Sequence, residues 1–166
     1  MDQVSLVPSL TRLSTFWALQ PEKIFEQTTT YYQQSLRASM AAAARSVGAA
    51  VDGPAQPGRD KRFADPAWTD NPYFWWVRQQ YLLRNEAAAA LVDDSDLDEA
   101  DRRKSAFATQ TLLDALSPTN FAATNPAVLK RAIETNGQSL ARGMQTYLDD
   151  LANNGGAPQQ VATGVH

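Results

Sequence analysis

Apolar residues recur at helical spacing along most of the chain, and no segment alternates in the way that a strand requires. The longest pattern opens at Pro21, because a proline at the first helical position loses no hydrogen bond that the helix would have made. It contains these apolar positions: Ile24, Tyr31, Tyr32, Leu36, Met40, Ala43 and Val47. The pattern predicts one long amphipathic helix over residues 21–50. Leu10, Leu13 and Trp17 indicate a short helix before it.

A segment rich in proline and glycine, DGPAQPGRD, follows at residues 52–60 and contains no apolar residue able to anchor it to a core. We therefore expect a linker that separates a helical arm, residues 1–51, from a helical domain, residues 61–156. Residues 157–166 have no periodicity and predict a flexible tail. The pattern permits two arrangements of the arm: an independent one, and one in which it packs back as an ordinary helix.

Two capping signals open the expected domain. Asp65 precedes Pro66 and Asn71 precedes Pro72, and each pair places a capping side chain directly before a proline. The spacing predicts a short helix, a sharp turn, and a second helix from Pro72 to about Val92.

A third helix is predicted after an acidic segment, with Asp96 as its cap and Glu99 at the capping-box position. It should end near Ser117, because Pro118 disfavours helical geometry in the residue before it. The side expected to be buried carries Phe107, Leu112, Leu113 and Leu116.

The last apolar pattern begins at Asn125 and Pro126 and predicts one helix to about Leu151. Gly137 and Gly143 weaken it by roughly 1 kcal/mol each relative to alanine. The predicted fold class is therefore all-α, with about four to six helices and a long N-terminal amphipathic arm.

Composition excludes several classes of function. The net charge of −3 over 166 residues, with both signs intermixed, provides no broad positive field for nucleic acid. The absence of cysteine excludes disulfides, thiol nucleophiles and thiolate metal sites within this chain. We see no signal-peptide core and no apolar run of about 18 residues, so we expect neither export by that route nor a membrane span.

The sequence predicts no catalytic residue, no metal ligand and no cofactor. The aspartates around residues 93–98 lack the glycine and the glutamate of a calcium loop, so a solvated, helix-capping turn is the better interpretation. Ser105, Ser117 and Ser139 could act as nucleophiles only with a base in reach, and the single histidine is His166 at the end of the chain.

The aromatic window FADPAWTDNPYFWWVRQQYLL, residues 63–83, is the most unusual feature of the sequence. Trp68, Phe74 and Tyr81 are interpreted as core residues. Three consecutive aromatic positions span about 300° of a helix and cannot all face one neighbour, so at least one tryptophan is expected to meet a surface outside the chain. The predicted partner-binding residues are Trp68, Tyr73, Trp75, Trp76, Tyr31 and Tyr32.

Several short sequence motifs occur in a specific order: FADPAW, NPYF, YLL, DALSPTNF, TNP, DDL and NNGG. Through these motifs, which extend from Arg62 to about Pro158, the chain resembles the N-terminal region of bacterial poly(3-hydroxyalkanoate) synthases, also called poly-beta-hydroxybutyrate polymerases. Residues 1–58 match that region only in character. In the family, this region precedes an α/β-hydrolase-type acyltransferase domain, in which a cysteine, an aspartate and a histidine polymerise hydroxyacyl groups from coenzyme A thioesters. None of those residues has a counterpart here.

The resemblance implies a non-catalytic domain, inactive by itself, that positions, dimerises or activates a polymerase catalytic domain and aids granule association. The implied partners are the catalytic domain of the same synthase or a second synthase subunit, with phasins and the polymer granule surface as further ones. The implied location is cytoplasmic, at polyhydroxyalkanoate granules. The alternative is a stand-alone, phasin-like structural protein of the granule surface that acts through its amphipathic arm.

Overall fold

The computed structural model describes residues 7–56 and 58–153, and this part of the chain contains seven α-helices, two short 3-10 helices and no strand. The all-α prediction is confirmed. The predicted tail, residues 157–166, lies outside the described residues. The elements are α1 (Val7–Ala18), α2 (Pro21–Ser46), η1 (Lys61–Phe63), α3 (Ala67–Asp70), α4 (Pro72–Asp93), α5 (Glu99–Ala115), η2 (Pro118–Asn120), α6 (Pro126–Glu134) and α7 (Gln138–Asn153).

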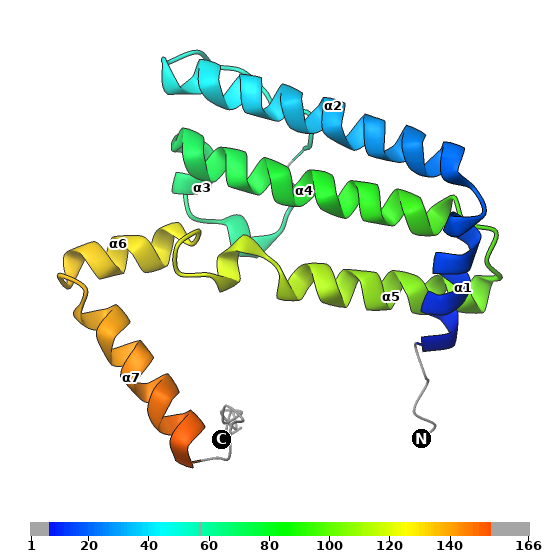
Figure 1. Ribbon diagram of the computed structural model, residues 1–166. Helices are drawn as coiled ribbons and strands as arrows, with labels where there is room; N and C mark the ends of the chain where they lie inside the picture. The colour runs from blue at the N-terminus through cyan, green and yellow to red at the C-terminus, as the bar shows by residue number, and fades with distance from the viewer. Residues whose placement is uncertain (1–6, 57, 154–166) are drawn as a thin grey trace. The chain divides into compact units, whose positions relative to one another are not determined.

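The chain divides into two compact units between Pro126 and Ala127, and the elements from α1 to η2 belong to the first unit. Within it, α2, α4 and α5 lie side by side and alternate in direction, with α4 in the middle (Figure 1). The short helix α1 crosses one end and contacts both α2 and α5. The central helix α4 therefore has neighbours on both sides within its own unit. No helix in the described ranges combines the length and the apolar character needed to cross a membrane.

The start of α4 follows its predicted capping signal. The Asn71 side-chain oxygen accepts hydrogen bonds from the backbone N–H groups of Tyr73 (2.9 Å) and Phe74 (3.3 Å), and Pro72 occupies the first helical turn. The helix ends at Asp93, one residue beyond the predicted end. Its buried residues lie on more than one side: Trp75, Arg78, Gln79, Gln80, Tyr81, Leu83 and Val92. A helix of this kind must be covered from several directions.

An aromatic cluster joins η1 and α3 to α4. The Phe63 ring lies edge-on to Trp68, with centroids 4.9 Å apart, and 5.6 Å from Tyr81. Phe74 packs against the same cluster, with its ring 5.7 Å from that of Trp68. Trp68 and Tyr81 are thus buried core residues, as the sequence predicts, whereas Phe74 is only partly buried against them.

The segment 52–60 is anchored through Ala55, which is buried in an apolar cluster with Ala38 and Leu83 and is also held by a polar side chain. The amide of Gln79 donates to the Ala55 carbonyl (2.7 Å) and accepts from the Ala55 N–H (3.0 Å), and both residues are fully buried. The expectation that this segment contains no apolar residue able to anchor it is therefore wrong, because Ala55 packs in the core. The buried Gln79 amide adds a second anchor, since it bonds both backbone groups of Ala55. With the segment fixed in this way, α2 packs along α4, which is the second of the two arrangements open from sequence. The division into arm, linker and domain stays a prediction.

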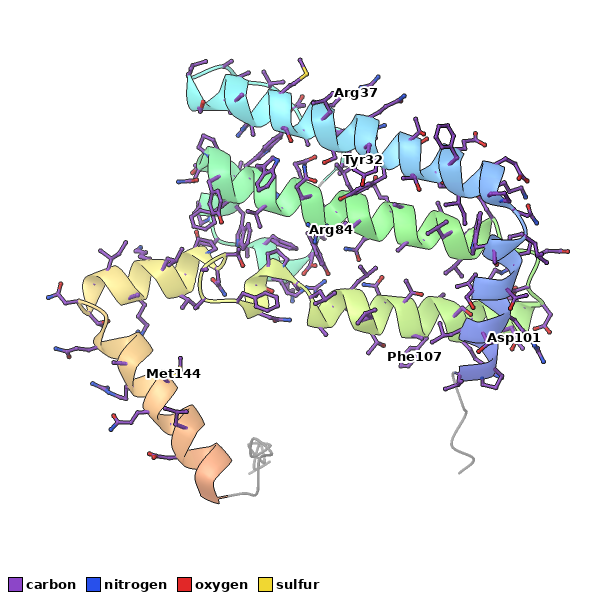
Figure 2. All side chains as sticks on the ribbon, viewed as in Figure 1. Tyr32, Arg37, Arg84, Asp101, Phe107 and Met144 are labelled. Atoms are coloured by element: carbon purple, nitrogen blue, oxygen red, sulfur yellow. The ribbon has the colours of Figure 1, made fainter. Side chains whose placement is uncertain are left out.

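The sequence misassigns the start and the buried side of α5. Asp98, not Asp96, caps the helix, since its carboxylate accepts from the Asp101 N–H at 2.8 Å. Phe107, Leu112 and Leu116 are exposed, and the buried residues are Asp101 and Ser105. Phe107 lies on the side of α5 opposite α4 (Figure 2). Small and polar residues at the contact let α5 approach its neighbours closely, which an apolar pattern cannot reveal.

The predicted single helix over residues 125–151 is interrupted. Asn136 (φ 49°) and Gly137 (φ 82°) adopt left-handed backbone geometry, and the Gly137 N–H donates to the Ala132 carbonyl at 2.7 Å. This bond closes the end of α6 in the manner of a Schellman motif, in which Asn136 occupies the left-handed position that directly follows the helix. Asn136 and Gly137 therefore end one helix before α7 begins, and Gly137 does not weaken a continuous one.

Asp101 fixes α1 to α5 in the first unit. Its carboxylate accepts a hydrogen bond from the Ser9 hydroxyl (2.8 Å) and forms an ion pair with Arg12. The hydrogen bond from Ser9, and then the bond and charge of Arg12, hold the pKa of the Asp101 carboxyl below its ordinary value. Nearby, the Trp17 indole N–H donates to the Leu91 carbonyl at 2.8 Å.

We expect this contact to weaken in acid. Because the folded pKa of Asp101 lies below the unfolded value of about 3.9, the contact stabilises docked α1 above about pH 4 and is lost as the pH falls through the folded pKa. The Trp17 indole resonance in a ¹H–¹⁵N spectrum should shift over this range. In Asp101→Asn the resonance should be displaced already at neutral pH and should not titrate there. An identical acid transition in both proteins would contradict this account.

Candidate interaction site

The aromatic window separates into interior and surface residues. Trp68 and Trp75 are buried, Trp76 is half-buried, and Tyr73 is 50% exposed. Asn71 sets this outcome, because its cap fixes the first turn of α4 and thereby the direction in which each following side chain leaves the helix. Of these four aromatic residues, Tyr73 and Trp76 are the ones that remain accessible.

The second surface that the tryptophans need is supplied by α2. The Arg45 guanidinium carbon lies 4.8 Å from the centroid of the Trp75 ring, and Trp75 is only 4% exposed. The Trp76 indole N–H donates to the Ser39 hydroxyl at 3.1 Å. Trp75 is therefore covered within the chain, and Trp76 is the tryptophan of this pair that stays partly accessible.

The two tyrosines of α2 have different surroundings. Tyr31 packs against the buried cluster of Ala38, Ala55 and Leu83, whereas Tyr32 is largely exposed. Partner binding by any of the six residues proposed from sequence stays a prediction, and the structure leaves Tyr32, Tyr73 and part of Trp76 accessible for it.

A pocket of about 290 Å³ opens beside Tyr73 and Trp76, between α4 and the segment that follows α5. We call it the Tyr73–Phe121 pocket. It is lined by Tyr73, Trp76, Val77, Gln80, Tyr81, Arg84, Leu116, Pro118, Phe121 and Thr124. Three large side chains at it are about half exposed: Tyr73 (50%), Leu116 (53%) and Phe121 (49%). The volume is just below the range of about 300–1,000 Å³ typical of small-molecule sites, so it suits an inserted side chain better than a cofactor.

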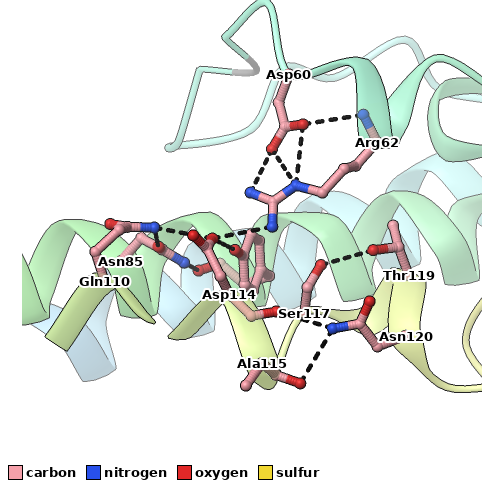
Figure 3. Close-up of polar contacts among 10 residues, drawn as sticks. Asp60, Arg62, Asn85, Gln110, Asp114, Ala115, Ser117, Thr119 and Asn120 are labelled. Atoms are coloured by element: carbon pink, nitrogen blue, oxygen red, sulfur yellow. Dashed lines mark hydrogen bonds and ion pairs between the residues drawn. The ribbon is translucent and has the colours of Figure 1, made fainter. Parts of the chain in front are cut away.

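A polar network holds the far wall of this pocket (Figure 3). The Arg62 guanidinium lies between two carboxylates, 2.7 Å from Asp60 and 2.9 Å from Asp114. The Asn120 amide donates to the carbonyls of Asp114 (2.9 Å) and Ala115 (3.1 Å). These bonds fix the end of α5 and the start of η2, and so fix Leu116, Pro118 and Phe121.

The charges of this network reinforce one another. The side-chain hydrogen bond from Arg62 lowers the pKa of the Asp60 carboxyl, and the same contact raises the pKa of Arg62. Burial raises the pKa of Asp114, but hydrogen bonds from Arg62, Gln110 and Tyr81 outweigh it, so this carboxyl also has a lowered pKa. The network is therefore fully charged at neutral pH.

The described ranges contain neither histidine nor cysteine. Ser105 and Ser117 are fully buried, and the Ser117 hydroxyl pairs with that of Thr119 at 2.9 Å. His166 lies outside the described residues. Among those that are described, no group of three acidic, histidine or cysteine side chains could hold a metal ion.

Sequence reasoning missed several pocket residues. The sequence predicts Leu116 on the buried side of a helix, yet Leu116 is half exposed, and so is Phe121 beside it. The sequence does not indicate Gln80 and Arg84 as pocket residues, because polar residues on a helix are ordinarily surface residues. Pro118 is the one residue whose type indicates this part of the pocket, since a proline here stops α5 and begins η2 beside the pocket.

Comparison with known proteins identifies similar sequences. A family model described as "Poly-beta-hydroxybutyrate polymerase (PhaC) N-terminus" matches residues 59–164. The poly(3-hydroxyalkanoate) polymerase subunit PhaC of Rhizobium meliloti (strain 1021) is 36% identical over 149 residues, which is 89% of this chain and 24% of that protein. The poly(3-hydroxyalkanoate) polymerase of Methylorubrum extorquens is 38% identical over 151 residues, 89% of this chain and 25% of the relative. No solved structure matches the chain.

The extent of these alignments matters in two ways. The chain spans about a quarter of the length of these curated relatives. An alignment that covers 89% of the chain must include α2, so the similarity reaches further toward the N-terminus than the short motifs from Arg62 onward indicate. The expectation that residues 1–58 match only in character is therefore too narrow.

Proposed function

Since this chain belongs to the poly-beta-hydroxybutyrate polymerase (PhaC) N-terminus family, we propose that it is a non-catalytic helical domain that serves poly(3-hydroxyalkanoate) synthesis by docking on a polymerase catalytic domain. Docking would position or activate that domain. The observation that carries the proposal is the Tyr73–Phe121 pocket, which has an exposed apolar rim and lies in a part of the chain without a nucleophile–base pair.

The rim provides affinity in this proposal. Full burial of a large apolar side chain contributes about 1.5–3 kcal/mol, so covering the exposed half of Tyr73, Leu116 and Phe121 would contribute about 1 kcal/mol each. Aromatic anchors grouped around a small pocket are typical of interface hot spots.

The rest of the pocket provides specificity. The Arg62–Asp114 network holds the far wall in place before binding, which lowers the entropic cost of association. Arg84 is exposed at the pocket and has no ion pair among the described residues. The partner segment should therefore carry an apolar anchor next to a carboxylate.

The test mixes this chain with a relative's polymerase from which the matching N-terminal quarter has been removed. We expect association and a faster release of coenzyme A from a hydroxyacyl thioester. A Leu116→Asp, Phe121→Asp double variant should weaken association at least about tenfold, since it places two charges in the apolar contact. Phe107→Asp is the matched control, because Phe107 is 65% exposed on the other side of α5.

The outcomes separate clearly. Absence of both association and rate change would refute the proposal, as would equal effects of the pocket and control variants. Turnover of the thioester by this chain alone would refute its non-catalytic character.

A second candidate is a phasin-like structural protein of the polymer granule surface. One observation favours it: large apolar side chains are exposed along the outer side of α2, among them Phe25 and Leu36. In that case the chain should co-sediment with polymer granules in the absence of polymerase, the pocket variant should still bind, and Leu36→Glu should not.

A further inference from the structure

Arg78 of α4 is a buried cation without an acidic partner. The residue is only 6% exposed, and its guanidinium carries five N–H groups. Among the described residues these groups have one acceptor, the Thr69 hydroxyl at 3.5 Å, which is longer than an ordinary hydrogen bond. The enclosed Nε has no acceptor. Charged side chains are almost never buried in this way unless something pairs with them.

A second arginine lies beside the first. Arg45, in the last turn of α2, donates from its two terminal nitrogens to the carbonyls of Val51 (2.9 Å) and Thr69 (2.6 Å). Both guanidiniums therefore contact Thr69, where the end of α2 comes close to α3 and to the start of α4 (Figure 1). Burial lowers the pKa of the Arg78 guanidinium, and the charge of Arg45 acts in the same direction.

No carboxylate balances these two charges in the part of the chain that the structure describes. The acids nearest in the sequence are Asp52, next to Val51, and Asp70, next to Thr69, and both are exposed. Arg62 of the same unit, by contrast, lies between two carboxylates. Because an arginine stays protonated at any ordinary pH, the pair keeps its two positive charges, and burial makes an uncompensated charge costly.

We propose that Arg78, Arg45 and the Thr69 hydroxyl form a binding site for a phosphate group, either free or as a monoester. A phosphate group carries a charge of about −1.5 to −2 at neutral pH, which matches two guanidiniums, whereas a carboxylate carries one negative charge. Its oxygens accept from several donors at once, and arginine binds them through paired N–H groups.

The site is separate from the one described above. Thr69 is exposed, so a small anion can approach the two guanidiniums from the Thr69 side. Arg78, Arg45 and Thr69 do not line the Tyr73–Phe121 pocket. The inference therefore does not depend on the function proposed for that pocket, and its test needs no polymerase.

Inorganic phosphate is the probe for the first experiment. Thermal unfolding of the full chain, followed by circular dichroism, should move to higher temperature as phosphate is added, because a ligand that binds the folded state stabilises it. Sodium chloride at equal ionic strength should not reproduce the shift. The Thr69 amide and the Trp75 indole resonances should move along the same binding curve. An unfolding temperature that follows ionic strength alone would overturn the proposal.

Arg78→Met separates a binding role from a structural one. The substitution removes an unpaired buried charge, so in chloride the variant should unfold at the same temperature as the unmodified chain or higher. Its affinity for phosphate, measured by calorimetric titration, should fall at least about tenfold. Thr69→Val changes an exposed position and should weaken binding by about threefold.

Arg37→Met is the matched control. Arg37 is exposed on α2 (labelled in Figure 2) and forms no ion pair within the described ranges, so its loss should leave the phosphate affinity unchanged. Equal affinity in Arg37→Met and Arg78→Met would overturn the proposal. Lower stability of Arg78→Met in chloride would also overturn it, because the fold itself would then satisfy the guanidinium.

Other anions decide the class of ligand. Acetate that raises the unfolding temperature as much as phosphate would assign the site to a carboxylate and overturn the proposal. Glycerol phosphate distinguishes the two sources of a phosphate group. An affinity equal to or above that of inorganic phosphate supports a monoester as the ligand, and binding of inorganic phosphate alone supports the free ion.

Discussion

Replacing Trp68 with alanine is expected to lower the free energy of unfolding by about 3–5 kcal/mol. The indole is only 1% exposed and packs edge-on against Phe63 and against Phe74. It joins the short helix α3 to both η1 and α4, so its removal leaves a cavity that three elements share. Chemical denaturation followed by circular dichroism at 222 nm measures the effect, with equal slopes for the two proteins as the condition for the comparison.

Tyr73→Ala is the matched control for this cavity. Tyr73 belongs to the same aromatic window but is half exposed, so its replacement should cost about 1 kcal/mol or less. Equal destabilisation by the two substitutions would contradict the assignment of Trp68 to the core and of Tyr73 to the surface.

Gln79→Leu is expected to destabilise the fold by about 2–5 kcal/mol, although it places a more apolar side chain at a buried position. The reason is that both backbone groups of Ala55 lose their partner, and each buried group left without one costs about 1–3 kcal/mol. Hydrogen exchange of the Ala55 amide should accelerate in the variant even where α4 remains protected. Unchanged stability together with an unchanged Ala55 amide would contradict the anchoring of this segment by Gln79.

A glycine pair provides an independent control on the same contact. A Cβ added at Gly53 would lie 2.4 Å from the Gln79 side-chain amide, so Gly53→Ala must displace that amide and destabilise in the same direction. Gly58→Ala, in the same segment, meets no atom within 4 Å and should be nearly neutral.

The sequence predicts the helices of this protein well where a local signal specifies them. Asn71 with Pro72 locates the start of α4 because the cap and the proline act within one turn. Pro21 locates the start of α2 for the same reason. The break between α6 and α7 was accessible in principle, because Asn136 and Gly137 are the residue types that tolerate a positive φ, but a continuing apolar pattern outweighed them.

Burial was less predictable, because it depends on partners distant in the sequence. Phe107 and Leu112 of α5 are exposed to solvent, while Ser105 and Asp101 face the interior. No periodicity distinguishes these cases without knowledge of α1 and α4. Trp75 is a similar case. Its neighbour Arg45 lies thirty positions earlier, so the helical wheel of α4 alone does not show which residue covers the Trp75 ring.

The candidate site was located only in part. Tyr73 and Trp76 were found because aromatic residues in consecutive positions diverge around a helix. The other half of the Tyr73–Phe121 pocket, with Leu116 and Phe121, comes from the end of α5 and the following segment, and its place is set by the Arg62–Asp114 ion pair across fifty-two positions. Such a contact leaves no local trace in the sequence.

The side of α2 that packs on α4 is largely alanine, and so smooth a surface would by itself let one helix slip past the other by a turn. Three polar contacts at successive levels prevent this: Ser35 with Gln80, Ser39 with Trp76, and Arg45 with the Thr69 carbonyl. A shift of one turn, about 5.4 Å, would break all three contacts together. Helices α2 and α4 therefore pack in a single register. This register fixes the position of Tyr32 relative to Tyr73 along the helix axes, so a partner that binds both residues meets them at a constant separation.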